Sequence, residues 1–192
     1  MIRLKNMPVF IFTLLVLSTQ TLQSEVLEVF ISWNSYLCDD KCADLIKRRF
    51  ESMKQVESIE VNSGSGSAKI KWNPESLFSY QAVKTQLQMV GVGLSELRVR
   101  VRGKGVPQGK GAALISSGDN TRFNLISPIR GTPGEYIALP DGSQLSLADG
   151  LKEKILSSAQ EKKTIVIEGP IYQGHRSPPL YLVVSRLQIE KK

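Results

Sequence analysis

The first half of the chain contains four short stretches in which apolar and polar residues alternate. These stretches are rich in β-branched and aromatic residues, which indicates half-buried strands. They cover residues 26–33, 56–61, 68–72 and 97–102. The second and third are separated by a run of Asn, Ser and Gly at 62–67, which predicts a flexible hairpin loop.

Two stretches between these strands repeat their apolar residues at helical spacing instead. The first follows Asp39 and Asp40, either of which can cap a helix, and the second follows the cap Asn73 and the first-turn proline Pro74. The residues that recur at helical spacing on one face of the first helix are Cys42, Leu45, Ile46, Arg49, Phe50 and Met53. The apolar stripe of the second helix is Leu77, Tyr80, Val83, Leu87 and Val90. The order β-α-β-β-α-β predicts a ferredoxin-like unit, in which both helices cover one face of an antiparallel sheet.

The second half predicts a mostly β arrangement that follows a basic, turn-rich connection at 104–111. The predicted elements are strands at 112–116, 121–126, 164–169 and 180–189, a turn at 117–120, a long loop at 128–142 and a helix at 146–160. With the strand at 97–102 included, the order β-β-β-α-β-β is that of a small OB-like barrel. The predicted fold class is therefore α+β, a ferredoxin-like domain followed by an OB-like one. Whether residues 97–102 serve one sheet or both stays open.

The N-terminus has the pattern of a secretory signal. A basic segment at 1–7 precedes an apolar run at 8–17, which is shorter than the about 20 residues that span a membrane. We therefore expect removal of residues 1–24, no stable membrane span afterwards, and a periplasmic or secreted location; an uncleaved N-terminal anchor is the alternative. The rest of the chain divides into a predicted ferredoxin-like domain at 25–104, expected to fold alone, and an OB-like domain at 105–192.

Composition is typical of a globular protein, since 41% of the residues are apolar and 22% are charged. The formal net charge is +7, part of which lies in the predicted signal. In an exported protein, this modest excess favours an anionic envelope surface over nucleic acid as a partner. OB barrels that bind nucleic acid stack bases on aromatic side chains, and aromatic residues make up only 7% of this chain. We expect no nucleic-acid partner.

Cys38 and Cys42, the two cysteines of the chain, lie where the first predicted strand gives way to the first helix. Amides at a helix N-terminus favour thiolate over thiol, and two thiolates can hold a soft metal ion such as Cu(I). Zinc fits less well because it normally takes four ligands. A disulfide, which an oxidising compartment permits, and a pair of ordinary buried thiols are the open alternatives.

Residues 26–102 resemble a heavy-metal-associated domain, the small module of copper chaperones and metal-transporting ATPases. The shared features are the strand before the cysteines, two thiols at a loop-to-helix junction, the strand at 56–61, and a second helix that follows a proline and ends at a glycine. The family pattern is Gly-Met-x-Cys-x-x-Cys, whereas here Tyr36 replaces the Met and three residues separate the cysteines. The resemblance implies copper-type binding by Cys38 and Cys42. Residues 165–172 resemble the fourth strand of exported OB-like domains.

Other chemically suggestive residues have simpler explanations. His175, the single histidine, can ligate a metal from the second half, but its Gly- and Pro-rich loop favours a solvated residue. Arg98, Arg100 and Arg102 share one strand face, which is either an anion-binding stripe or the solvated side of a sheet. The chain has no Ser-His-Asp set, phosphate-binding glycine loop or recognisable carboxylate pair, so we expect no enzyme.

The sequence therefore predicts an exported, two-domain, non-enzymatic protein that binds a copper-type ion through Cys38 and Cys42. Its C-terminal domain is expected to contact an envelope protein. The alternative is an envelope interaction module whose ferredoxin-like domain has no working metal site, with the cysteines disulfide-bonded or buried.

Overall fold

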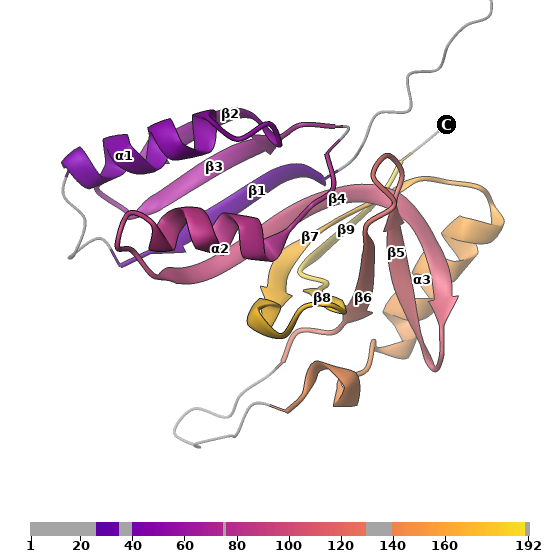
Figure 1. The fold of residues 1–192 in the computed structure, drawn as a ribbon. Coiled ribbons are helices and arrows are strands. Elements are labelled where there is room, and N and C mark those ends of the chain that lie inside the picture. Colours follow the sequence, from indigo (N-terminus) through magenta and orange to yellow (C-terminus); the bar gives the residue numbers. More distant parts are fainter. Residues whose placement is uncertain (1–25, 35–39, 75, 130–139, 191–192) are drawn as a thin grey trace, which may run out of the picture.

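The computed structural model describes residues 26–34, 40–74, 76–129 and 140–190. Its strands are β1 (Val26–Trp33), β2 (Val56–Asn62), β3 (Ser67–Trp72), β4 (Leu94–Gln108), β5 (Gly111–Ser116), β6 (Arg122–Ile126), β7 (Ile165–Tyr172), β8 (Leu180–Val183) and β9 (Arg186–Ile189). Its helices are α1 (Asp40–Glu51), α2 (Tyr80–Gln88) and α3 (Asp149–Gln160), with 3₁₀ turns η2 (Gly142–Gln144) and η3 (Gly174–Arg176). The fold is mixed α/β, and the strands form one hydrogen-bonded sheet in the order β2-β3-β1-β4-β5-β6-β8-β7-β9 (Figure 1).

The first half keeps the predicted β-α-β-β-α-β order. β1 lies between β3 and β4 and is antiparallel to both, while β2 pairs with the far side of β3. α1 and α2 cover one face of these four strands (Figure 1). Side chains on that face, such as Val29, Ile70 and Val99, are fully buried because the helices exclude water from it.

Five strands of the second half close into a barrel, because β7 pairs with β4 as well as with β8. Within the barrel β6 and β8 run parallel, and the other pairs are antiparallel. α3 follows β6 in the chain and packs against β4 and β5. Its buried Ile155 lies directly on Gly105 of β4, where an added Cβ would be 2.5 Å from the Ile155 Cγ2 atom.

The sequence left open whether residues 97–102 serve one sheet or both. In the structure these residues belong to β4, which pairs with strands of both halves. On one edge it pairs with β7 from Arg98 to Gly103. On the opposite edge it pairs first with β1, up to Val101, and then with β5, from Gly103 onward. The predicted boundary between residues 104 and 105 therefore falls inside a strand. Buried side chains of both halves form one apolar core.

The basic connection predicted at 104–111 is wrong, because β4 continues to Gln108 and turns directly into β5 at Gly111. Of the glycines in this segment, Gly105 lies within β4 directly under Ile155, whereas Gly109 does lie in a turn, with a φ of +51°. Gly103, just ahead of the segment, is a second point of close approach. A Cβ on Gly103 would overlap the carbonyl oxygen of Ile115 on β5. Because Gly103 and Gly105 have no side chain, β5 and α3 can pack directly on β4 where it passes from the open sheet into the barrel.

The second helix begins later than predicted. Ser79 caps it, because its Oγ accepts a hydrogen bond from the Ala82 amide at 3.2 Å. The predicted cap, Asn73, instead donates from its side-chain amide to the Lys54 carbonyl at 3.1 Å. Leu77 consequently lies ahead of the helix, outside its apolar stripe, and is 65% exposed.

Three smaller differences concern packing and strand ends. Leu45 of α1 is 50% exposed rather than part of the buried stripe. β7 continues through Gly169, which the sequence placed at its end, and the predicted final strand divides into β8 and β9. A Cβ on Gly169 would overlap the Val183 carbonyl oxygen, so this glycine is again a point of close approach. No helix in the described ranges is long and apolar enough to cross a membrane, and the predicted signal lies outside those ranges.

Candidate functional site

The predicted metal ligands are described only in part. Cys42 lies in the first turn of α1, is half-buried against the core and is disulfide-bonded. The other cysteine of the chain, Cys38, lies outside the described residues. His175 is exposed in η3. Among the described residues, no group of three or more His, Cys, Asp and Glu side chains could hold a metal ion. Metal binding by Cys38 and Cys42 stays a prediction.

The arginines predicted as a stripe share one face of β4, as the alternation required. Each is ion-paired with a carboxylate from another part of the chain, in β7, in β1 or just after β9. The pairs are Arg98 with Glu168 at 3.3 Å, Arg100 with Glu28 at 3.4 Å and Arg102 with Glu190 at 2.9 Å. Glu28 also pairs with Lys69 and Glu168 with Arg186, so this face of the sheet is a partly solvated network of ion pairs.

An apolar groove of about 530 Å³ opens where the beginning of α2 meets the barrel. We call it the α2–barrel groove. One wall is the segment 77–81, the second is the turn into β6 together with β6 itself, and the third is the loop 177–180 ahead of β8. Its lining includes Leu77, Tyr80, Arg122, Asn124, Pro179 and Leu180.

Phe78 fixes the position of this groove relative to both halves. Its ring packs edge-on against Trp72 of β3, with 5.5 Å between centroids, and lies 6.0 Å from the ring of Phe123 in the barrel. Its backbone amide donates to the Asp119 carboxylate at 3.0 Å. Asp119 also accepts from the amide and the hydroxyl of Thr121. The floor of the groove is therefore held by contacts from three separate parts of the chain.

Tyr80 and η3 form a second rigid contact at the groove. A Cβ on Gly174 would overlap the Tyr80 ring, so the ring packs directly on the η3 backbone. Gln81 donates from Nε2 to the His175 carbonyl at 3.4 Å. Burial raises the pKa of Tyr80, whose phenol would be neutral at physiological pH even without that shift. The groove thus has an uncharged wall on the α2 side.

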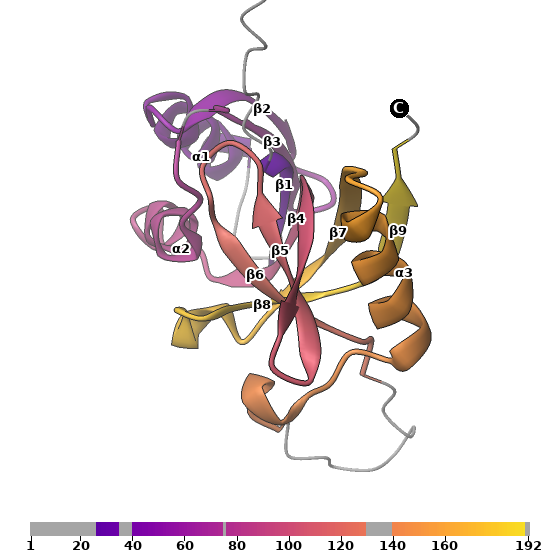
Figure 2. The ribbon, with the colours of Figure 1, turned by 90° about the vertical axis from the view of Figure 1, so that its right-hand side faces the viewer.

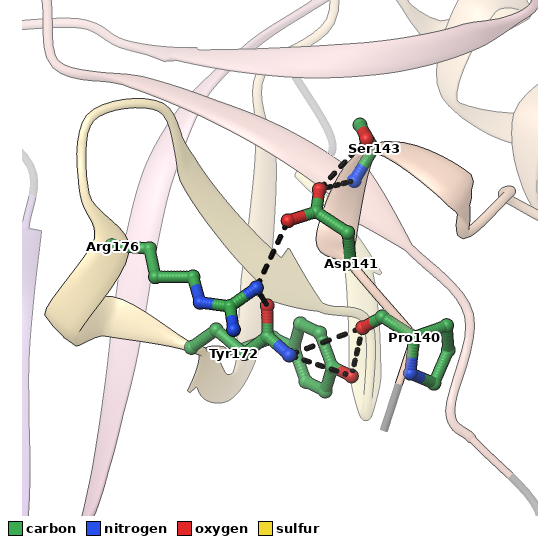
Figure 3. A network of polar contacts seen from close by, with 6 residues as sticks. Pro140, Asp141, Ser143, Tyr172 and Arg176 are labelled. Carbon is green, nitrogen blue, oxygen red and sulfur yellow. Dashed lines mark hydrogen bonds and ion pairs between the residues drawn. The ribbon is translucent and has the colours of Figure 1, made fainter. Parts of the chain in front are cut away.

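A network of polar contacts joins the η2 turn to η3 (Figure 3). Asp141 caps η2, accepting from the amide and the hydroxyl of Ser143 at 2.9 and 2.7 Å, and pairs with Arg176 at 3.1 Å. Tyr172 donates from Oη to the Pro140 carbonyl at 2.7 Å. The hydrogen bonds from Ser143, helped by Arg176, hold the pKa of Asp141 below its ordinary value. Asp141 therefore stays a carboxylate that can hold η2 beside the groove's third wall.

No protein-family model matches the chain, and no curated protein or solved structure matches it either. Sequence reasoning missed the α2–barrel groove because Leu77 has the spacing of a helix stripe. Ser79 and the Pro178–Pro179 pair could have indicated a loop at each of these places, but nothing in the sequence indicates that the two loops meet.

Proposed function

We propose that this protein is a non-catalytic envelope interaction module that binds an extended segment of a partner protein in the α2–barrel groove. The first half is taken as ferredoxin-like, since its strand order β2-β3-β1-β4 with two helices on one face supports that class. The second half is taken as OB-like, since five strands close a barrel with α3 between β6 and β7.

The observation that carries the proposal is Leu77, a large apolar side chain that is 65% exposed at the rim of an apolar groove. A single exposed leucine needs no explanation, but a leucine beside a concave apolar surface is the usual anatomy of a binding site. The scaffold around it is rigid, since Phe78, Tyr80 and Gly174 are all held by packing. A pre-formed groove lowers the entropic cost of binding.

A protein segment suits this groove better than a reactive small substrate. Among the described residues of its lining, Arg122 is the only side chain that is charged at neutral pH, and the neighbouring polar groups are amides and hydroxyls. Such a lining can hold apolar side chains and satisfy a peptide backbone, but it supplies no acid–base pair.

The test is a selection of phage-displayed random peptides on the immobilised wild-type protein, followed by affinity measurements with synthetic versions of the enriched peptides. We expect Leu77→Asp to weaken their binding at least about tenfold, because a carboxylate cannot be desolvated in the groove without cost. Leu45→Asp, which changes another half-exposed leucine on α1, is the matched control and should bind like the wild type. Failure to enrich any peptide, or equal binding by both variants, would reject the proposal.

Copper binding by Cys38 and Cys42 is the second proposal. It is supported by the position of Cys42 in the first turn of α1, where backbone amides favour thiolate. While Cys42 is disulfide-bonded its sulfur is not a thiolate, so the protein would have to be reduced before it bound Cu(I).

This second proposal is tested by competition for Cu(I) against a chelator, using the reduced wild type, Cys38→Ser and Cys42→Ser. Loss of retention in both variants supports a shared site. Equal, weak retention by all three proteins eliminates copper binding and leaves the interaction module as the function.

A further inference from the structure

A second cavity of about 370 Å³ lies on the other side of β6, between the barrel and η2. We call it the η2 pocket. Asn124 of β6 lines both this pocket and the α2–barrel groove, so the two cavities meet at its side chain. Figure 2 faces this part of the molecule, with α2 and η3 to the left of the β5–β6 hairpin and η2 below it. We call these two adjoining cavities, taken together, the channel.

The register of the barrel shows which side chains line the channel's middle. Arg122 and Asn124 are two residues apart on β6 and therefore point to the same, outer face. Asn124 lies opposite Tyr181 of the parallel strand β8, and Tyr181 lines the η2 pocket. A Cβ on Gly142 would be 2.6 Å from the Tyr181 ring, so η2 packs directly on that ring. The channel's middle and far end are thus held by strand pairing and by the Asp141 network.

Among the described residues that line the two cavities, the side chains charged at neutral pH are Arg122 and Lys110, and both are exposed. The nearby carboxylates are engaged, since Asp119 accepts from Phe78 and Thr121 and Asp141 accepts from Ser143 and Arg176. Gln108 accepts a hydrogen bond from the Arg122 guanidinium, which holds that group near the middle of the channel. This contrasts with the outer face of β4, where carboxylates pair the arginines.

We propose that the channel binds an extended acidic peptide segment, with an apolar side chain in the α2–barrel groove and carboxylates beside Arg122 and Lys110. This inference rests on the proposed function and adds the chemistry of the partner. Charge complementarity selects an anionic ligand, and the apolar groove with its Leu77 and Pro179 selects one that also carries apolar side chains. A nucleic acid or a sulfated polysaccharide would leave that apolar groove unused.

The probes are three fluorescent twelve-residue peptides measured by anisotropy at low salt. The acidic peptide repeats Ser-Glu-Leu-Asp, the neutral one repeats Ser-Gln-Leu-Asn, and the third repeats Ser-Glu-Ser-Asp and has no apolar anchor. We expect the wild type to bind the acidic peptide at least about tenfold more tightly than either other peptide, and to lose that preference at high salt.

The variant Arg122→Gln with Lys110→Gln should lose the preference for the acidic peptide. Lys47→Gln with Arg48→Gln removes the same charge from the exposed face of α1 and should keep it. Thermal unfolding of both proteins checks that the channel variant is folded. Equal binding of acidic and neutral peptides by the wild type, or equal loss in both double variants, would overturn the inference.

Two further outcomes separate this inference from the proposed function. If phage-selected peptides depend on Leu77 while Arg122 and Lys110 have no effect, the interaction module stands and the acidic channel is wrong. If heparin binds through Arg122 and Lys110 as tightly in Leu77→Asp as in the wild type, the site is a general polyanion site and the peptide assignment is wrong.

Discussion

Glu28 of β1 shows how a single carboxylate connects neighbouring strands. It accepts from Lys69 of β3 at 2.6 Å and pairs with Arg100 of β4 at 3.4 Å. Burial by itself would raise the pKa of Glu28, but the hydrogen bonds and charges of Lys69 and Arg100 outweigh it and lower the pKa. The ionised form of Glu28 is therefore favoured in the folded state.

Replacing this carboxylate should make stability depend less on pH. Because the pKa is lower in the folded state, the stabilisation is present above the unfolded-state value of about 4.3 and is lost as the pH falls through the folded-state pKa. We expect Glu28→Gln to lower the free energy of unfolding by about 1 kcal/mol or less at pH 7 and to approach the wild type near pH 3. Denaturant titrations at several pH values measure this. An unchanged difference across that range, or the same trend in the exposed control Glu153→Gln, would contradict it.

Ser116, unlike Glu28, is a polar residue without a polar contact. It is fully buried, and its Oγ has no hydrogen-bond partner among the described residues. Burying a hydroxyl without a hydrogen-bond partner is unfavourable, because no bond within the protein replaces the lost bonds to water. Ser116→Ala should therefore leave stability unchanged or raise it by up to about 1 kcal/mol. Ser158 is the matched control, because it is also buried but donates to the Lys154 carbonyl at 2.7 Å, so Ser158→Ala should destabilise the protein. Thermal unfolding compares them, and a clearly destabilised Ser116→Ala would show that the hydroxyl is paired.

At the scale of elements, β4 is the strand on which the fold depends. Its Gly103 pairs with β5 on one edge and with β7 on the other, and its missing side chain makes room for the Ile115 carbonyl. Glycine is needed at this position because the β5 backbone lies too close for a side chain, and not because the chain turns there.

Adding one methyl group at Gly103 should disrupt this crossing. We expect Gly103→Ala to destabilise the protein by about 1–3 kcal/mol, since backbone atoms of β5 would have to move. Gly93, just ahead of β4, is the control position, because a Cβ added there would have no neighbouring atom within 4 Å and its backbone conformation is ordinary. Gly93→Ala should therefore unfold like the wild type. Equal unfolding midpoints for the two variants would show that the barrel absorbs the methyl group without strain.

At the scale of the whole molecule, the two halves share one strand and one core. The sequence led us to expect that residues 25–104 fold alone. The structure gives a reason to expect otherwise, because that fragment would lose the β7 partner of β4 and the Phe123 ring beside Phe78. We therefore expect the two halves to unfold as one cooperative unit.

The positions of the tryptophans allow a direct test of this cooperativity. Trp33 and Trp72, the two tryptophans of the chain, both lie in the first half, whereas Ile155 lies on α3 at the barrel. Ile155→Ala should destabilise the barrel by about 2–5 kcal/mol and should shift the tryptophan fluorescence transition as much as the circular dichroism transition. A fluorescence transition that stays in place, or cooperative melting of residues 25–104 alone, would show that the halves are independent.

Alternation and helical spacing were enough to predict most elements. The bounds predicted for β1 match the structure, and the order of strands and helices in the first half is confirmed. In the second half the order is as predicted up to β7, after which the single predicted strand is two, β8 and β9. These features depend on which side of each segment meets the core, and that information is present in the local sequence. The barrel is likewise predicted by the order of its elements.

The groove and the channel were decided by tertiary structure. Leu77 has helical spacing, but α2 begins after the Ser79 cap, so Leu77 lies outside the helix. Arg122 lies beside Gln108 because β5 pairs with both β4 and β6. Glycine is common in loops, yet Gly103 and Gly169 lie within strands. A side chain is excluded at both positions because a carbonyl oxygen from a distant part of the chain lies against the backbone there. The local sequence determined which residues face the core, whereas the contacts that form the candidate site join residues far apart in the chain, and only the folded backbone brings those together.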